Sequence, residues 1–203
     1  MRRIITFIIA ANAVLLLSGC EQASQEPDQA AVAAASGAYK TCAACHGAQG
    51  QGNAGLKGPS LVNLDRWYMK RQLQNFRDGV RGRHPKDIDG MMMAGQAAMF
   101  KDDAAIDAVI AQISTFPNVE PLATLKTDLG NGKETYQAIC GACHGVEGTG
   151  NEIMKAPSLR GIDDWYLVSQ YEKFREGIRG AHENDLYGQQ MQRMGHVLTK
   201  EES

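Results

Sequence analysis

Two stretches of the chain repeat one another without a gap, at the offset of 98 residues that separates Cys42 from Cys140. The repeat begins where Cys42-Ala43-Ala44-Cys45-His46-Gly47 aligns with Cys140-Gly141-Ala142-Cys143-His144-Gly145, and it continues to the pair Met93 and Met191. About half of the positions from Cys42 to Met93 are identical, which is too many for chance. The chain is therefore a tandem duplication of one small domain.

The join between the two copies lies near Pro117 and Pro121, which interrupt any helix. We predict a first domain at 37–116, a linker at 117–129 and a second domain at 130–203. A domain of under about 100 residues has a marginal core, and a covalent or metal staple is common at that size.

The hydrophobic patterns inside each domain have helical spacing. Asp65 can cap a helix that carries Trp67 and Val80, and Asp103 to Ile113 forms a second amphipathic helix. No stretch alternates with the period of a strand. The predicted fold class is all-α.

Four of the five cysteines form two Cys-x-x-Cys-His motifs, and this pattern is the strongest chemical signal in the chain. Two thiols three residues apart on one helical turn can each add to a vinyl group of haem, and the next residue, histidine, supplies an imidazole nitrogen to the iron. The motifs predict two covalently bound haem c groups. The residues involved are Cys42, Cys45, Cys140 and Cys143 for attachment, and His46 and His144 for iron.

Other chemistries also use paired cysteines. A thioredoxin-like redox pair needs a strand followed by a helix, and it does not require a histidine after both motifs. A zinc site built from the two pairs is more often intracellular. A disulfide within either motif would leave the repeated histidines without a role.

The fifth cysteine, Cys20, lies at the end of a predicted export signal. Arg2 and Arg3 precede an apolar run from Ile4 to Leu17, too short to span a bilayer as a stable helix. The end of this run, Leu17-Ser18-Gly19-Cys20, resembles the bacterial lipobox, which implies a signal peptide at 1–19 and a lipid on Cys20. The alternative is an ordinary signal peptide. Residues 20–36 have the composition of a flexible tether.

From residue 37 onward the sequence resembles the class I c-type cytochromes, in particular the dihaem c-four type. The resemblance implies two small helical domains, each wrapped around one covalent haem, with histidine on one face of the iron and methionine on the other. The two domains should face each other about a pseudo-two-fold axis.

Only one pair of methionines aligns at the 98-residue offset, and we predict that this pair supplies the second protein ligand of each haem iron. Met93 aligns with Met191, whereas Met91, Met92, Met99 and Met194 align with other residue types. The family register points to the same two residues. His84 and His182 also align, so ligation by two histidines stays an alternative, which would lower the potential.

The resemblance also implies further residues around the haem. Pro59 and Pro157 match the proline whose carbonyl accepts a hydrogen bond from the ligating histidine. Trp67 and Trp165 are expected in the haem-pocket core, with the indole N–H near a propionate. Arg81 and Arg179 are expected to pair with propionates, or to be solvated.

Two features depart from the family pattern. Tyr136 lies four residues before Cys140, whereas Tyr39 lies three before Cys42, so the registers differ. The second copy stops at Ser203, which aligns with Ala105, although Thr199 and Glu202 have the spacing of a capping box and predict that a helix follows. We therefore expect this copy to be a fragment from which the last helix of the family is missing.

These observations predict an electron carrier between a respiratory donor and an oxidase or reductase acceptor, on the periplasmic side of a bacterial membrane. A haem-bearing subunit of an oxidase or reductase complex is an alternative, and a dihaem enzyme such as a peroxidase or a thiosulfate-oxidising cytochrome is a third. The net charge of −2 gives no reason to expect nucleic acid.

Overall fold

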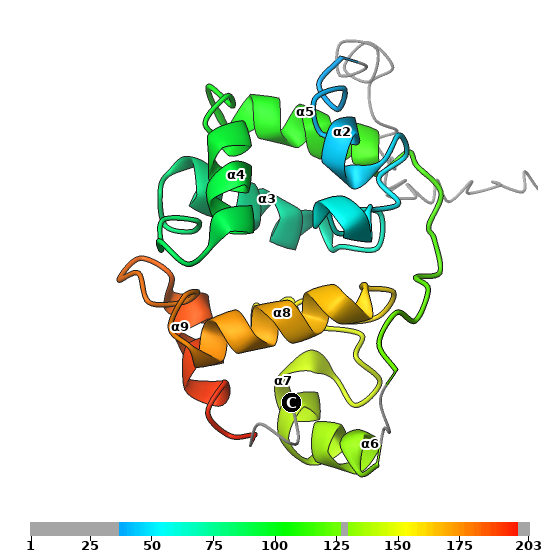
Figure 1. Ribbon diagram of the computed structural model, residues 1–203, viewed down its shortest axis with the longest axis vertical. Helices are drawn as coiled ribbons and strands as arrows, with labels where there is room; N and C mark the ends of the chain where they lie inside the picture. Colours follow the sequence, from blue (N-terminus) through cyan, green and yellow to red (C-terminus); the bar gives the residue numbers. More distant parts are fainter. Residues whose placement is uncertain (1–36, 127–129, 199–203) are drawn as a thin grey trace, which may run out of the picture.

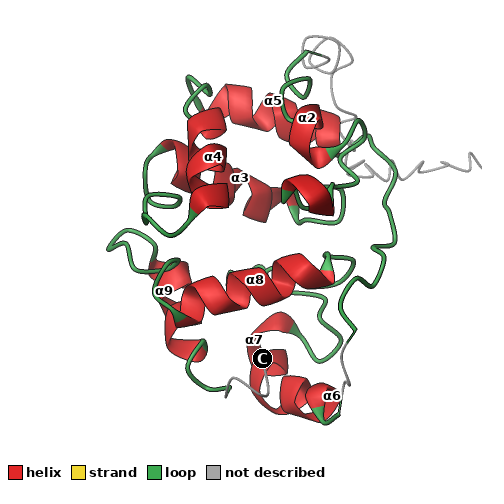
Figure 2. Ribbon diagram, viewed as in Figure 1, coloured by secondary structure: helices red, strands yellow, loops and turns green. Residues whose placement is uncertain are grey.

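The computed structural model describes residues 37–126 and 130–198, and their regular secondary structure is helical (Figure 2). Two isolated bridges, Asn53 with Gly58 and Asn151 with Ala156, are the β-type pairings within these ranges. The prediction of an all-α fold is confirmed. The predicted signal peptide, Cys20 and the pair Thr199 and Glu202 lie outside the described residues.

The first domain is built from four α-helices and one short 3-10 helix. They are α2 (Ala43–His46), η1 (Ala54–Leu56), α3 (Arg66–Arg77), α4 (Ile88–Ala97) and α5 (Asp103–Ile113). The amphipathic helix predicted at Asp103 to Ile113 is confirmed as α5. Its four apolar side chains, Ile106, Val109, Ile110 and Ile113, are at most 3% exposed, and they form a core with Tyr39 and Met69.

The second domain repeats the order of α2, α3 and α4, and two short helices precede its motif. Its helices are α6 (Gly132–Thr135), the π-helix η2 (Tyr136–Cys140), α7 (Gly141–His144), α8 (Asp164–Arg175) and α9 (Leu186–Met194). Helix α8 begins and ends 98 residues after α3, so the sequence repeat is also a structural repeat. No helix in the described part of the chain is long and apolar enough to cross a membrane.

The π-helix η2 absorbs the difference in register before the second motif. A π-helix closes each turn with an i→i+5 hydrogen bond, so it takes up one residue more per hydrogen-bonded turn than an α-helix does. As a result the Tyr136 hydroxyl donates to the Gly145 carbonyl at 2.9 Å, just as the Tyr39 hydroxyl donates to the Gly47 carbonyl at 2.7 Å. The two tyrosines therefore make the same contact despite their different spacing from the cysteines.

The start of α3 differs from the prediction. Asp65 occupies the N-cap position, but its carboxylate makes no capping hydrogen bond, and the helix ends at Arg77, before Val80. The Asp65 carboxylate instead accepts a hydrogen bond from the Ser158 backbone N–H in the other domain at 2.8 Å. The Asp65 carboxylate therefore bonds to the other domain and not to the first turn of its own helix.

The two domains pack against each other through α3 and α8 (Figure 1). The Asp65 contact has an exact counterpart, because the Ser60 backbone N–H donates to the Asp163 carboxylate at 2.7 Å. Each residue in one contact aligns with a residue in the other at the repeat offset. Such an isologous interface is the signature of two-fold symmetry, so the predicted pseudo-two-fold arrangement is confirmed.

The chain between the domains is fixed to the second one. Residues 117–126 contain no helix, and Asp164 at the start of α8 accepts hydrogen bonds from the backbone N–H groups of Thr124 and Leu125 and from the Thr124 hydroxyl. These bonds lower the pKa of the Asp164 carboxyl to about 2. Asn63 of the first domain donates to the Val119 and Gly161 carbonyls, which fastens the same segment from the other side.

Candidate haem sites

Each Cys-x-x-Cys-His motif forms a single helical turn. The His46 backbone N–H donates to the Cys42 carbonyl at 2.9 Å, which holds the two thiols and the imidazole on one turn. Gly47 follows with φ of 81° and ends the helix there; the residue at the same place in the second domain, Gly145, has φ of 79°. No disulfide joins the four thiols of the two motifs. Burial raises the pKa of the Cys42 and Cys140 thiols.

Both motif histidines are oriented by a proline carbonyl, as expected for Pro59 and Pro157. His46 Nδ1 lies 2.7 Å from the Pro59 carbonyl oxygen, and His144 Nδ1 lies 2.8 Å from that of Pro157. A carbonyl can only accept, so Nδ1 carries the proton and Nε2 keeps its lone pair for a metal. Burial lowers the pKa of both imidazoles, which favours the neutral, ligating form.

The second domain contains a mainly apolar cavity of about 520 Å³ above its motif. Cys140, Cys143 and His144 line it on one side, and Met191 of α9 lines it as well. Its apolar wall consists of Ile139, Leu159, Ile162, Leu167 and Phe174, among others. The cavity thus brings together the predicted thiols, the histidine and the methionine of the second site.

Met93 and Met191 lie inside helices α4 and α9, on the sides that face the domain interior. Met93 is half-buried and packs against Phe76, Ala94 and Ala97, whereas its neighbours Met91 and Met92 are 38% and 56% exposed. Met194 also lines the second cavity but is 38% exposed.

The two loop histidines make local contacts. His84 Nδ1 accepts a hydrogen bond from the Lys86 backbone N–H, and His182 Nδ1 accepts one from that of Asn184. His182 does not line the cavity of the second domain. The geometry there favours methionine over a second histidine.

Arg81 and Arg179 are both buried in a hydrogen-bond network that joins the domains, so the solvated alternative does not hold. Arg81 donates to Gln72, Tyr166 and Gln170, at distances from 2.7 to 3.2 Å. Arg179 makes the matching set, donating to Gln170, Tyr68 and Gln72 at 2.8 to 3.0 Å. Each guanidinium therefore binds both copies of the glutamine and the tyrosine of the opposite domain.

Several buried N–H groups of this network lack a hydrogen-bond partner. They are Nε and Nη1 of Arg71, Nε of Arg81 and Nε of Arg179. Arg71 and Arg179 line the cavity of the second domain. Buried cationic donors without partners are costly unless an anionic group meets them. An apolar cavity with such donors at its edge fits haem, whose apolar macrocycle carries two carboxylates.

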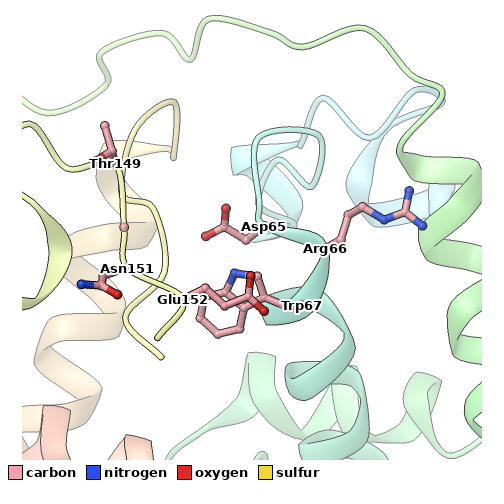
Figure 3. Close-up of a pocket in the computed structure, with 7 residues that line it drawn as sticks. Asp65, Arg66, Trp67, Thr149, Asn151 and Glu152 are labelled. Atoms are coloured by element: carbon pink, nitrogen blue, oxygen red, sulfur yellow. The ribbon is translucent and has the colours of Figure 1, made fainter. Parts of the chain in front are cut away.

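The two tryptophans lie at the interface between the domains, in contrast to the predicted haem-pocket core. The Lys155 ammonium lies 5.5 Å from the centre of the Trp67 ring, and the Lys57 ammonium lies 5.5 Å from that of Trp165. Trp67 lines a cleft of about 460 Å³ between the domains, where it lies beside Glu152 (Figure 3). Trp165 does not line the second cavity. Cross-domain cation–π contacts hold both rings there.

Several polar residues of this region were not predicted from the sequence. They are Tyr68, Tyr166, Gln72, Gln170, Asp87, Asp185 and Arg71. All but Arg71 have an identical residue at the repeat offset, and this recurrence of polar residues could have marked them as candidates. Asp87 and Asp185 cap α4 and α9 by accepting from the backbone N–H groups of Gly90 and Gly188.

Two helical domains, each with a covalent-attachment turn beneath an oriented histidine, define a dihaem c-type cytochrome. The chain belongs to the cytochrome c family, which it matches over residues 32–116 and 129–203. It therefore carries two covalently bound haem c groups.

The chain is similar in sequence to an electron acceptor and to an oxidase subunit. The chain is 32% identical over 190 residues to the thiosulfate dehydrogenase electron acceptor of Stutzerimonas stutzeri, covering 89% of this chain and 84% of that protein. It is also 32% identical to the cbb3-type cytochrome c oxidase subunit FixP of Bradyrhizobium diazoefficiens, of which it spans 65%, with 88% of this chain covered.

Cytochrome c4 is similar in sequence and in structure. The protein from Azotobacter vinelandii is 29% identical, covering 72% of this chain and 73% of that protein. The crystal structure of reduced cytochrome c4 from Pseudomonas stutzeri superposes with a TM-score of 0.65, covering 84% of this chain and 92% of that chain, at 24% identity. That structure has the same two-domain fold.

Proposed function

We propose that the protein carries single electrons between a respiratory donor and a terminal acceptor, and that His46 and Met93 would hold the haem iron in the first domain and His144 and Met191 in the second. One observation carries the proposal: a single apolar cavity is lined by both His144 and Met191. Bound haem iron supplies a one-electron couple. An iron held by both a histidine and a methionine would have no position left for a substrate, which favours electron transfer over catalysis.

The protein residues of the site have distinct tasks. Pro59 and Pro157 hold the imidazoles in one tautomer and orientation, which keeps the ligand set unchanged between oxidation states. The apolar cavity wall excludes water and so limits solvent reorganisation. The methionine thioether stabilises ferrous iron and raises the potential.

Replacing either methionine tests the ligand assignment. In the oxidised protein, Met93→Ala and Met191→Ala are each expected to remove about half of the methionine-to-iron charge-transfer band, because each iron loses its thioether. The measurement is the optical spectrum of the purified holoprotein. Met194→Ala is the matched control, since Met194 also lines the second cavity, and its band should be unchanged. A wild-type protein without the band, or an M194A variant that loses half of it, would contradict the assignment.

The similarity to FixP favours a second candidate, a haem-bearing subunit of an oxidase complex. The similarity to a thiosulfate dehydrogenase electron acceptor favours a free carrier that accepts electrons from such an enzyme. Purification from membranes in mild detergent distinguishes them, because a subunit keeps a stoichiometric partner and a carrier does not. Turnover of peroxide or thiosulfate by the purified protein alone would favour an enzyme instead.

We also propose that a lipid on Cys20 holds the protein on the periplasmic side of a bacterial membrane. The lipobox-like Leu17-Ser18-Gly19-Cys20 supports this location. Cys20→Ser is expected to move most of the protein from the membrane fraction to the soluble fraction, because the thiol that carries the acyl chains is lost. Haem content serves as the control and should not change. Equal membrane association of both proteins would argue against the anchor.

A further inference from the structure

The interface between the domains is largely symmetric, and Arg71 is one of the positions that break this symmetry. Asp65, Ser60, Tyr68, Gln72 and Arg81 each have an identical residue at the repeat offset. Arg71 of α3, in contrast, aligns with Ser169 of α8. At this position the first domain therefore contributes a cation to the interface, whereas the second domain contributes an uncharged serine.

Arg71 belongs to the first domain, but its side chain lines the haem cavity of the second. The guanidinium lies 4.8 Å from the centre of the Tyr187 ring and 4.9 Å from that of Trp67, and Nη2 donates to the Lys155 carbonyl at 3.2 Å. These contacts fix the plane of the group. Its other donors, Nε and Nη1, are buried without a hydrogen-bond partner.

The charge of Arg71 is not neutralised by a direct ion pair. Within the described residues, no carboxylate oxygen lies within 4.0 Å of its guanidinium nitrogens, and Asp185 acts on it only at longer range. Burial lowers the pKa of Arg71 from its ordinary value, which reports a cation that has lost solvation without full compensation. A guanidinium nevertheless stays protonated in proteins.

The cation that extends from the second domain into the first is placed differently from Arg71. Lys173 of α8 crosses the interface, and its ammonium lies 2.6 Å from a carboxylate oxygen of Asp87, which is 2% exposed. The residue that aligns with Lys173 is Asn75, so Asp185 has no such partner. The Lys173 ammonium, which extends into the first domain, is therefore paired with the Asp87 carboxylate. Arg71, in contrast, lines the second cavity with Nε–H and Nη1–H unpaired.

We propose that Arg71 is a cross-domain positioning residue that binds a carboxylate of the second haem and makes this haem the stronger electron acceptor of the two. A fixed cation stabilises the state of a neighbouring redox group that has one electron more, and the effect is larger where water is excluded. Ser169 gives the first haem no equivalent cation. When the protein holds one electron, this electron therefore resides mainly on the second haem. The inference rests on the proposed electron-transfer function.

Neutralising Arg71 in the full-length holoprotein tests the proposal. A potentiometric titration resolves two one-electron steps, assigned to their domains by the NMR signals of the Met93 and Met191 methyl groups. Arg71→Gln is expected to lower the electron affinity of the second haem about tenfold, which is about 59 mV for a one-electron couple, and to leave the first step nearly unchanged. Arg71→Lys, which keeps the charge, should restore most of the shift.

Arg66→Gln is the matched control. Arg66 lies on the same helix and is exposed, it does not line the cavity of the second domain, and its loss changes the net charge equally. It should shift neither step appreciably. The proposal is overturned if R71Q shifts both steps equally or neither, or if R71K behaves like R71Q. The absence of two reversible one-electron steps in the wild type would instead overturn the proposed function itself.

Discussion

Replacing Gly82 with alanine is expected to lower the free energy of unfolding of the first domain by about 3 kcal/mol, which is a drop of about 10 °C or more in its melting temperature. Gly82 has φ of 76°, where an L side chain is strained. An added Cβ would also overlap the carbonyl oxygen of Gly90 in α4 and lie 3.1 Å from the Ala94 Cβ. Neither neighbour can move without displacing the helix.

The same displacement reaches the iron ligand, because Met93 lies one turn after Gly90 on α4. We expect G82A to weaken the methionine-to-iron charge-transfer band by up to about half. Thermal unfolding followed by circular dichroism gives the stability, and the optical spectrum gives the ligation. Gly180→Ala, where the added Cβ would overlap the Gly188 carbonyl, should have the same effect on the second domain.

Gly95 provides the control for this substitution within the same helix. It is exposed in α4, and no atom lies within 4 Å of an added Cβ. Gly95→Ala should therefore stabilise the protein by about 0.5 to 1 kcal/mol through higher helix propensity. Equal melting temperatures for G82A and G95A would refute the claim that close packing of the loop on α4 positions Met93.

The parts of the fold that the sequence predicted well are those that depend on local pattern. Helix α5 was predicted with its observed bounds, because the apolar spacing that identifies it lies within the helix itself. The hydrogen bonds from His46 and His144 to the prolines were expected from the family pattern. Each of these features is contained within a single domain.

The parts that it could not predict depend on how the two copies meet. Asp65 was expected to cap its own helix, and Trp67 to lie in a haem pocket, yet both make their contacts with the opposite domain. A repeat shows which residues recur, but not which surface of one copy faces the other. The offset between Tyr136 and Cys140 was similarly read as a change in register, whereas a π-helix restores the hydroxyl contact.

Removing the second pair of attachment cysteines is expected to halve the covalently bound haem. In Cys140→Ala/Cys143→Ala the turn beneath His144 has no thiol left to form a thioether, while Cys42 and Cys45 are untouched. The pyridine haemochrome assay on denatured protein should therefore fall from about two haems per chain to about one. Cys42→Ala/Cys45→Ala should give the same count from the opposite domain. Retention of two covalent haems in either variant would contradict the attachment sites.

The two variants are nevertheless expected to differ in what remains folded. Ten buried apolar side chains lie in the first domain, including the α5 residues, whereas only Ala156, Ile162 and Phe174 are buried among the described residues of the second. An apolar cavity of about 520 Å³ occupies much of the interior of the second domain. Because so little apolar surface is buried between the described side chains of this domain, we expect haem to contribute more to its core than to that of the first.

Loss of the second haem should therefore unfold α8 and α9, while loss of the first should leave α5 packed on Tyr39 and Met69. Limited proteolysis is the measurement. We expect C140A/C143A to yield a resistant fragment that corresponds to the first domain, and C42A/C45A to remain largely resistant in both domains. Equal resistance of the second domain in the two variants would show that its own side chains suffice. Unequal resistance would mean that the duplicated sequence has left one copy stabilised mainly by its helices and the other mainly by its cofactor.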